Sequence, residues 1–209
     1  MGQSCCENKC ESLQGLAEKQ RKVLWTVLTI NALMFFVEYF WGLYAHSQAL
    51  MADSLDMLGD ALAYASTLFV VGKSNVAKAR SSQFKAWIMI VLGLSVLGKT
   101  FYSLYFGHKP LEFTMLLVAA IALLANSFCL WLLGKHKNDD INCRSVWICS
   151  RNDIISNSSV LVAAFLVNYF NSAWPDIVVG ALIAFLFLKS AFGILHDSAE
   201  VISADARSR

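Results

Sequence analysis

The stretch that decides the fold is Ser47–Asp60, SQALMADSLDMLGD, in which three carboxylates interrupt a run of apolar residues. They belong to Asp53, Asp56 and Asp60, and offsets of three and four residues place all three on one face of a helix. A carboxylate in contact with hydrocarbon is energetically costly. We therefore expect this face to point into the protein or into a watery cavity.

A second polar stripe follows late in the chain. Cys149, Asp153 and Asn157 are spaced by four residues, so they also share a helix face. Asp56 and Asp60 lie one turn apart, as do Cys149 and Asp153, and two such pairs on facing helices would supply the four ligands of a tetrahedral metal site. Asn157 and Asp53 are possible additional ligands.

The composition indicates a membrane protein. The chain has 209 residues, of which 57% are hydrophobic and only 15% charged, with a mean hydropathy of +0.53. Soluble domains carry roughly a quarter charged residues. Because a membrane span needs about 20 apolar residues, the chain has room for about six spans and little else.

We predict an all-α membrane protein with six transmembrane helices. Residues 1–22 form a polar, cysteine-containing tail, residues 23–196 the transmembrane domain, and residues 197–209 a short tail. A basic turn is expected over residues 72–82. The predicted spans are residues 23–44, 48–71, 84–106, 111–133, 143–169 and 175–195.

Lysine and arginine residues predict the orientation. One side of the predicted bundle has only Lys109, so the positive-inside rule places the other side, with both termini, in the cytoplasm. An even number of spans is needed for this, in agreement with six. The residues on the basic side are Lys73, Lys78, Arg80, Lys85, Lys135, Lys137, Arg144, Arg207 and Arg209.

Further polar residues lie within the predicted spans. Glu38 either lines the cavity or lies near the interface and reaches water, and we favour the interface. We expect Lys99 to extend its amine toward the interface, with a role as counter-charge to the acids as the alternative. Asn126 is expected to make a hydrogen bond between helices. Arg151 either reaches cytoplasmic water or pairs with an acid when no metal is bound.

The six cysteines do not form the loop-borne framework of a small secreted domain. Cys5, Cys6 and Cys10 lie in the polar N-terminal tail. Reduced thiols on the cytoplasmic side of the membrane are the simpler interpretation. Capture of a soft metal by these three thiolates is the alternative.

The spacing also suggests how a metal could be exchanged. Without metal, the carboxylates would repel one another in a medium of low dielectric, and protonation would neutralise them. Protons and metal would then compete for the same groups, which is a physical basis for metal/proton exchange.

These motifs resemble those of the cation diffusion facilitator family of divalent metal/proton antiporters. That family's second helix resembles S-x-A-L-x-A-D-A-x-(H/D)-x-x-x-D, and its fifth helix resembles R-A-x-x-x-H-x-x-x-D. In the fifth helix Arg144 and Asp153 are in register, whereas Cys149 stands at the histidine position. The residues that fit the second-helix motif are Ser47, Ala49, Leu50, Ala52, Asp53, Asp56 and Asp60.

The resemblance implies a homodimeric transporter in the cell membrane, the inner membrane of a bacterium, that exports a zinc-like ion in exchange for protons by alternating access. Cadmium, cobalt and iron are further candidate substrates. It implies that Asp56, Asp60 and Asp153 are metal ligands with position 149 as the fourth, and that Asp53 is a structural or gating acid. No enzyme activity, resident cofactor or nucleic-acid partner is expected.

Two departures from the family's pattern have consequences. Cys149 in place of histidine favours thiophilic ions such as Cd²⁺ or Zn²⁺ if it coordinates; otherwise the amide oxygen of Asn157 substitutes. The chain is also expected to be a short member that lacks the family's cytoplasmic C-terminal domain, so that dimerisation would rest on the membrane part.

Two other functions were considered. A membrane metal sensor or assembly partner with the same fold, without transport, is the main alternative. An intramembrane aspartyl protease would also use paired aspartates for acid–base chemistry. Such proteases share a G-x-G-D motif, and here Met57 occupies the place of its first glycine.

Overall fold

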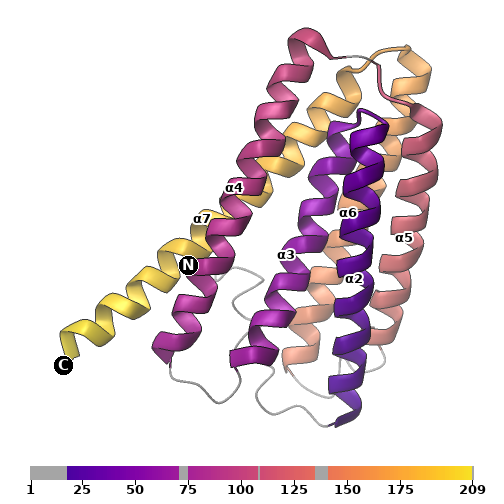
Figure 1. Ribbon diagram of the computed structural model, residues 1–209. Helices are drawn as coiled ribbons and strands as arrows, with labels where there is room; N and C mark the ends of the chain where they lie inside the picture. Colours follow the sequence, from indigo (N-terminus) through magenta and orange to yellow (C-terminus); the bar gives the residue numbers. More distant parts are fainter. Residues whose placement is uncertain (1–17, 71–74, 108, 135–140, 209) are drawn as a thin grey trace.

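The computed structural model describes residues 18–70, 75–107, 109–134 and 141–208. These residues are mainly helical (Figure 1). The helices are α2 (Glu18–Tyr44), α3 (Gln48–Val70), α4 (Asn75–Phe106), α5 (Glu112–Gly134), α6 (Ile141–Phe170) and α7 (Trp174–Ser208).

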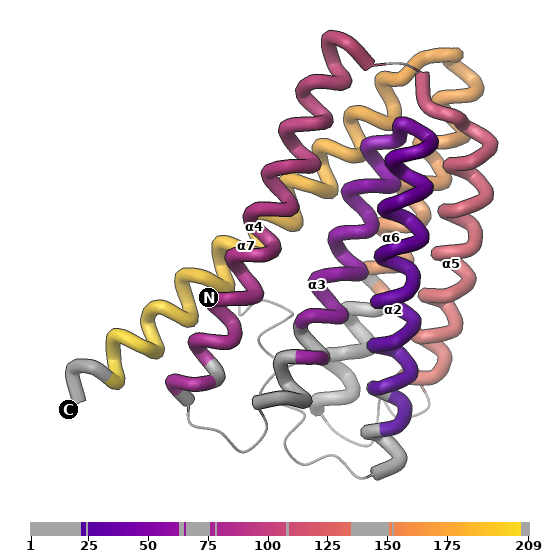
Figure 2. The backbone as a smooth tube through the Cα atoms, in the orientation of Figure 1, coloured from indigo at the N-terminus to yellow at the C-terminus, as the bar shows by residue number. Residues whose placement is uncertain are grey.

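Helices α2, α3, α5 and α6 stand together as one group, and α4 and α7 lie against each other beside it (Figure 2). α3 is the central helix, because it packs against α2, α4, α6 and α7. The start of α2 and the end of α7 lie toward the same end of the molecule (Figure 1). This is the arrangement that an even number of crossings requires.

Five of the helices in the described part of the chain are long and apolar enough to cross a membrane. α3 is not one of these five, and it carries the three aspartates Asp53, Asp56 and Asp60. The segments that qualify are Trp25–Tyr44, Ala79–Phe106, Glu112–Gly134, Asp153–Phe170 and Trp174–Asp205.

Four helices, α2, α4, α6 and α7, are longer than predicted, and the extensions of α4 and α7 are the largest. α4 begins at Asn75, inside the expected basic turn, because its first residues NVAKAR include good helix formers and no glycine or proline. α7 continues to Ser208, beyond the predicted end of the last span at residue 195, because the chain after Gly193 likewise contains no glycine or proline.

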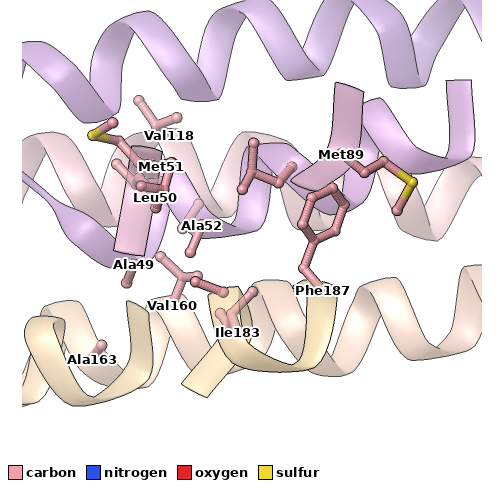
Figure 3. Packing of buried hydrophobic residues seen from close by; sticks show 14 of the residues in the cluster. Ala49, Leu50, Met51, Ala52, Met89, Val118, Val160, Ala163, Ile183 and Phe187 are labelled. Atoms are coloured by element: carbon pink, nitrogen blue, oxygen red, sulfur yellow. The ribbon is translucent and has the colours of Figure 1, made fainter. Parts of the chain in front are cut away.

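Side chains are distributed as expected for a protein surrounded by lipid. Large apolar side chains such as Phe40, Phe101 and Phe185 are more than half exposed. Small residues fill many of the buried positions, which lets helix backbones approach closely. Figure 3 shows this packing around Ala49 and Ala52 of α3.

α7 packs closely against the start of α3 at Gly180. A Cβ atom at this position would lie 2.6 Å from the carbonyl carbon of Gln48, which is too close for any side chain. Further along, Phe187 of α7 lies next to Met89 of α4 (Figure 3). Both side chains are buried.

The turn between α2 and α3 sets where the acidic helix begins. His46 has a positive φ of 56°, and the N–H of Ser47 donates to the carbonyl of Gly42 at 2.9 Å, which closes the end of α2. Ser47 then caps α3, since its Oγ accepts the N–H of Leu50 at 3.1 Å.

Asp176 of α7 completes this cap from another helix. Its buried carboxylate accepts the hydroxyl of Ser47 at 2.6 Å and the backbone N–H groups of Gln48 at 2.7 Å and Ala49 at 3.0 Å. A negative charge at a helix N-terminus is stabilised by the free N–H groups and the helix dipole. Asp176 therefore fixes the start of α3 against α7.

We predict that Asp176→Asn destabilises the protein by about 2 kcal/mol, because an amide cannot accept all three hydrogen bonds and turns its own N–H groups toward the donors. Thermal unfolding in detergent measures the effect. Glu200→Gln on α7 is the matched control, because that side chain is 71% exposed. Equal unfolding temperatures for the two variants would contradict this role of Asp176.

Candidate metal site

Three of the predicted ligands line one cavity. Asp56 and Asp60 of α3 and Asp153 of α6 face a space of about 520 Å³ that is also bordered by α4 and α7. Asp60 is buried, whereas Asp56 and Asp153 are partly exposed. The two acidic stripes of the sequence therefore meet in space, on facing helices.

The remaining wall of the cavity is mainly apolar. Met89 of α4 and Ile183 and Phe187 of α7 are among its lining residues, and the hydroxyl groups come from Ser156, Ser159 and Ser190. Electrostatic interactions are stronger beside such a wall than in bulk water. The carboxylates are the charged groups of the lining, so the cavity favours cations.

The acids share the cavity without forming a closed cage. Among the residues with described placement, no three His, Cys, Asp or Glu side chains are grouped so as to hold a metal ion. Coordination by Asp56, Asp60 and Asp153 together would require them to move toward a common centre. Two of them lie on α3 and one on α6, so a small shift between these helices would change their separation.

Asp53 occupies a different place from the other acids of its stripe. It is fully buried, it is not part of the cavity lining, and its Oδ1 accepts the hydroxyl of Ser156 at 2.6 Å. Ser156 is also 3.3 Å from Oδ2 of Asp56. The helical period correctly grouped these acids on one side of α3, but it could not separate Asp53 from the cavity.

Asn157 is fully buried on α6 and does not line the cavity. Its Nδ2 donates to the backbone carbonyl of Asp153 at 2.7 Å, one turn earlier. Its Oδ1 is buried and has no hydrogen-bond partner. Asn157 therefore supports the helix turn that presents Asp153, and its possible role as a metal ligand stays a prediction.

The side chain of Cys149 lies outside the described part of the structure, although its backbone belongs to α6. The predicted fourth ligand thus stays a prediction. Cys5, Cys6 and Cys10 also lie outside the described residues. Arg151, two residues after Cys149, is exposed, and both interpretations of its role stay predictions.

The expectation that Glu38 reaches water at the interface is wrong. Glu38 is fully buried, because α2 turns this residue toward the interior, where α3 covers it. Both of its carboxylate oxygens lack a hydrogen-bond partner. In the sequence, the burial of Glu38 was indicated only by its place as a single acidic residue within the apolar part of α2.

Two other intramembrane residues make contacts with methionines of α3. Asn126 of α5 is buried, and its Nδ2 is 3.7 Å from Sδ of Met57, which confirms a helix-to-helix contact. The Nζ of Lys99 is 3.1 Å from Sδ of Met51, near the start of α3.

Ser156 was not among the predicted site residues, because one serine in a helix carries no distinctive pattern.

Comparison with known proteins agrees with these features. The family model described as the cation efflux transmembrane domain matches residues 24–80 and 77–203. A cadmium, cobalt and zinc/H⁺–K⁺ antiporter of Bacillus velezensis is 24% identical over 79% of this chain and 58% of its own length. Zinc transporter ZitB of Yersinia pestis is 24% identical over 87% of this chain and 62% of its own length.

Other similar proteins differ in their named metal. The ZitB of Pectobacterium atrosepticum is 27% identical over 85% of this chain and 59% of its own length. A manganese efflux system protein of Bacillus subtilis, MneP, is 21% identical over 87% of this chain. The chain spans 58–62% of the length of the first relatives named above.

The family match covers most of the sequence and includes the helices that carry Asp56, Asp60 and Asp153. Together with the apolar helices, it makes the chain a multi-pass protein of the cell membrane. The chain belongs to the cation efflux family, and its helices correspond to that family's transmembrane domain.

Proposed function

We propose that this protein exports a divalent metal ion of the zinc class across the cell membrane in exchange for protons. The observation that carries the proposal is the cavity that Asp56 and Asp60 of α3 share with Asp153 of α6. Carboxylates on two facing helices can bind a cation and can also change their spacing when the helices move.

The ligand chemistry supports a metal such as Zn²⁺. Carboxylate oxygens bind this ion at about 2.0–2.2 Å, and thiolate sulfur at about 2.3 Å. Asp56, Asp60 and Asp153 with Cys149 would complete a tetrahedral shell. The transported ion is the substrate, and none of these residues needs a resident cofactor.

Protons are the natural competitors of the metal at this site. When the metal leaves, three carboxylates remain near one another beside an apolar wall. Proton uptake removes their mutual repulsion, and metal binding displaces the protons. Alternating access would follow if the metal-bound and protonated forms favoured different spacings of α3 and α6.

The relatives support this substrate class. Their names include zinc, cadmium, cobalt and manganese, and one is named as an antiporter of cadmium, cobalt and zinc with protons and potassium. Cys149 in this chain would favour the more thiophilic of these ions. We further propose that all six helices cross the membrane, with both termini in the cytoplasm, and that the protein works as a homodimer.

We predict that Asp60→Asn and Asp153→Asn each weaken Zn²⁺ binding by about tenfold or more, because each removes a charged ligand. Zn²⁺ uptake into vesicles containing the purified protein, under a pH gradient, should fall in parallel. Binding is measured by calorimetry and transport by a zinc-sensitive dye inside the vesicles.

Asp197→Asn serves as the matched control, because Asp197 lies on α7 outside the cavity lining. This variant should bind and transport Zn²⁺ as the unmodified protein does. If Asp60→Asn and Asp153→Asn behave like this control, the assigned site is wrong. Metal binding without any flux in the unmodified protein would instead favour a sensor.

The fourth ligand has a separate test. We expect Cys149→Ser to weaken Cd²⁺ binding more than Mn²⁺ binding, because sulfur prefers the softer ion. Cys149→His should restore Zn²⁺ binding while leaving Cd²⁺ binding reduced. Competition among Zn²⁺, Cd²⁺, Co²⁺ and Mn²⁺ for the purified protein measures both effects, and unchanged preferences in both variants would exclude coordination by Cys149.

A further inference from the structure

A second group of acidic and polar side chains lies outside the metal cavity. Glu38, Asp53 and Asn157 are each 0% exposed, and none of them lines the cavity. Four of their oxygens are buried without a hydrogen-bond partner: Oε1 and Oε2 of Glu38, Oδ2 of Asp53 and Oδ1 of Asn157. All four are acceptors, so what the group lacks is positive charge or donors.

The packing of α2 against α3 brings Glu38 to this place. A Cβ atom on Gly42 would lie 3.0 Å from the side chain of Met51, and Met34 packs in one cluster with Met57. Glu38 lies between these two contacts along α2. It therefore faces the stretch of α3 between the two methionines.

Asp53 lies in that stretch. The hydroxyl of Ser156 joins Asp53 to α6, and Asn157 is the next residue of that helix. Glu38 and Asp53 thus form a carboxylate pair between α2, α3 and α6.

The helices around the pair offer little to neutralise it. α3 and α5 contain no lysine, arginine or histidine, and the basic residues of α2 end at Lys22, more than four turns before Glu38. α6 contains Arg144 and Arg151, of which Arg151 is exposed and lies more than one turn before Ser156. On α4, the Nζ of Lys99 lies 3.1 Å from Sδ of Met51, near the start of α3. The titratable groups of α5 are Glu112, which binds Lys109 at 3.2 Å, and Cys129, which packs beside Val27. Two buried carboxylates without a counter-charge are strongly unfavourable.

We infer that Glu38 and Asp53, with the amide oxygen of Asn157, bind a monovalent cation, either a proton or an alkali-metal ion. Such a cation would supply positive charge beside four buried acceptor oxygens that have no hydrogen-bond partner. The ligand atoms are all oxygen, without sulfur or imidazole, which disfavours the thiophilic ions expected in the cavity. The group is therefore a cation site separate from the metal site.

This inference deepens the proposed function. It rests on that function in one respect, because only the role of the bound cation in exchange depends on it. A cation held by Glu38 and Asp53 would leave Asp56, Asp60 and Asp153 available to the metal. Metal entry beside the pair would add positive charge nearby and weaken the hold on the monovalent cation. The two sites would then be coupled through charge.

The test uses the full-length purified protein without metal, comparing the unmodified chain with Glu38→Gln. Infrared spectroscopy across a pH series detects a proton through the C=O stretching band of a protonated carboxyl group. Thermal unfolding in Na⁺ or K⁺, against a large organic cation at equal ionic strength, detects an alkali-metal ion. We expect one of these signals in the unmodified chain and its loss in Glu38→Gln.

Two further variants control the result. Asp53→Asn should lose the same signal, since it removes the other carboxylate of the pair. Glu112→Gln should keep it, because Glu112 lies at the start of α5 and its side chain is 34% exposed. The inference is overturned if Glu38→Gln and Asp53→Asn, folded by circular dichroism, match the unmodified protein in both measurements.

Transport separates this inference from the proposed function. In vesicles, Glu38→Gln should still bind Zn²⁺, while the acceleration of Zn²⁺ flux by a gradient of H⁺, Na⁺ or K⁺ should fall by about tenfold or more. An unchanged response to all three gradients would contradict the coupling. If the unmodified protein carries no metal at all, the proposed function fails, and the metal-free measurements still decide the cation site.

Discussion

The structure depends on one constraint, the burial of charged side chains in an apolar, lipid-facing protein. Asp53 and Asp60 are buried on α3, and a carboxylate turned toward lipid would be costly. α3 is therefore enclosed by α2, α4, α6 and α7, while large apolar side chains of other helices face outward. Buried polar side chains such as Glu38, Asp53 and Asn157 thus lie within a core that is otherwise mainly apolar.

Enclosure alone would not fix where the acids lie along the length of the helix bundle. That position follows from the capped start of α3, where Ser47 and Asp176 satisfy its first N–H groups. Because Asp176 belongs to α7, the cap also ties α3 to the helix that supplies Ile183 and Phe187 to the cavity wall. One hydrogen-bonded junction thus links the acids to the apolar surface they face.

The buried acids are divided between two environments. Asp56, Asp60 and Asp153 border a cavity, whereas Glu38 and Asp53 are enclosed by side chains. Ser156 lies at the boundary, because its hydroxyl is within hydrogen-bonding distance of both Asp53 and Asp56. A change in the charge of either group would be felt by the other across this serine, since the surroundings screen charge weakly.

The sequence by itself determined the helical class, the succession of six helices in the described part of the chain, the acidic face of α3 and its counterpart on α6, because hydropathy and the helical period are local properties. It also predicted the interhelical contact of Asn126. Only the tertiary structure decided that Asp53 leaves the cavity, that Glu38 is buried, and that Asp176 caps a helix more than a hundred residues earlier. The helical period states the direction of a side chain around its own axis, whereas the neighbour it meets depends on how the helices pack.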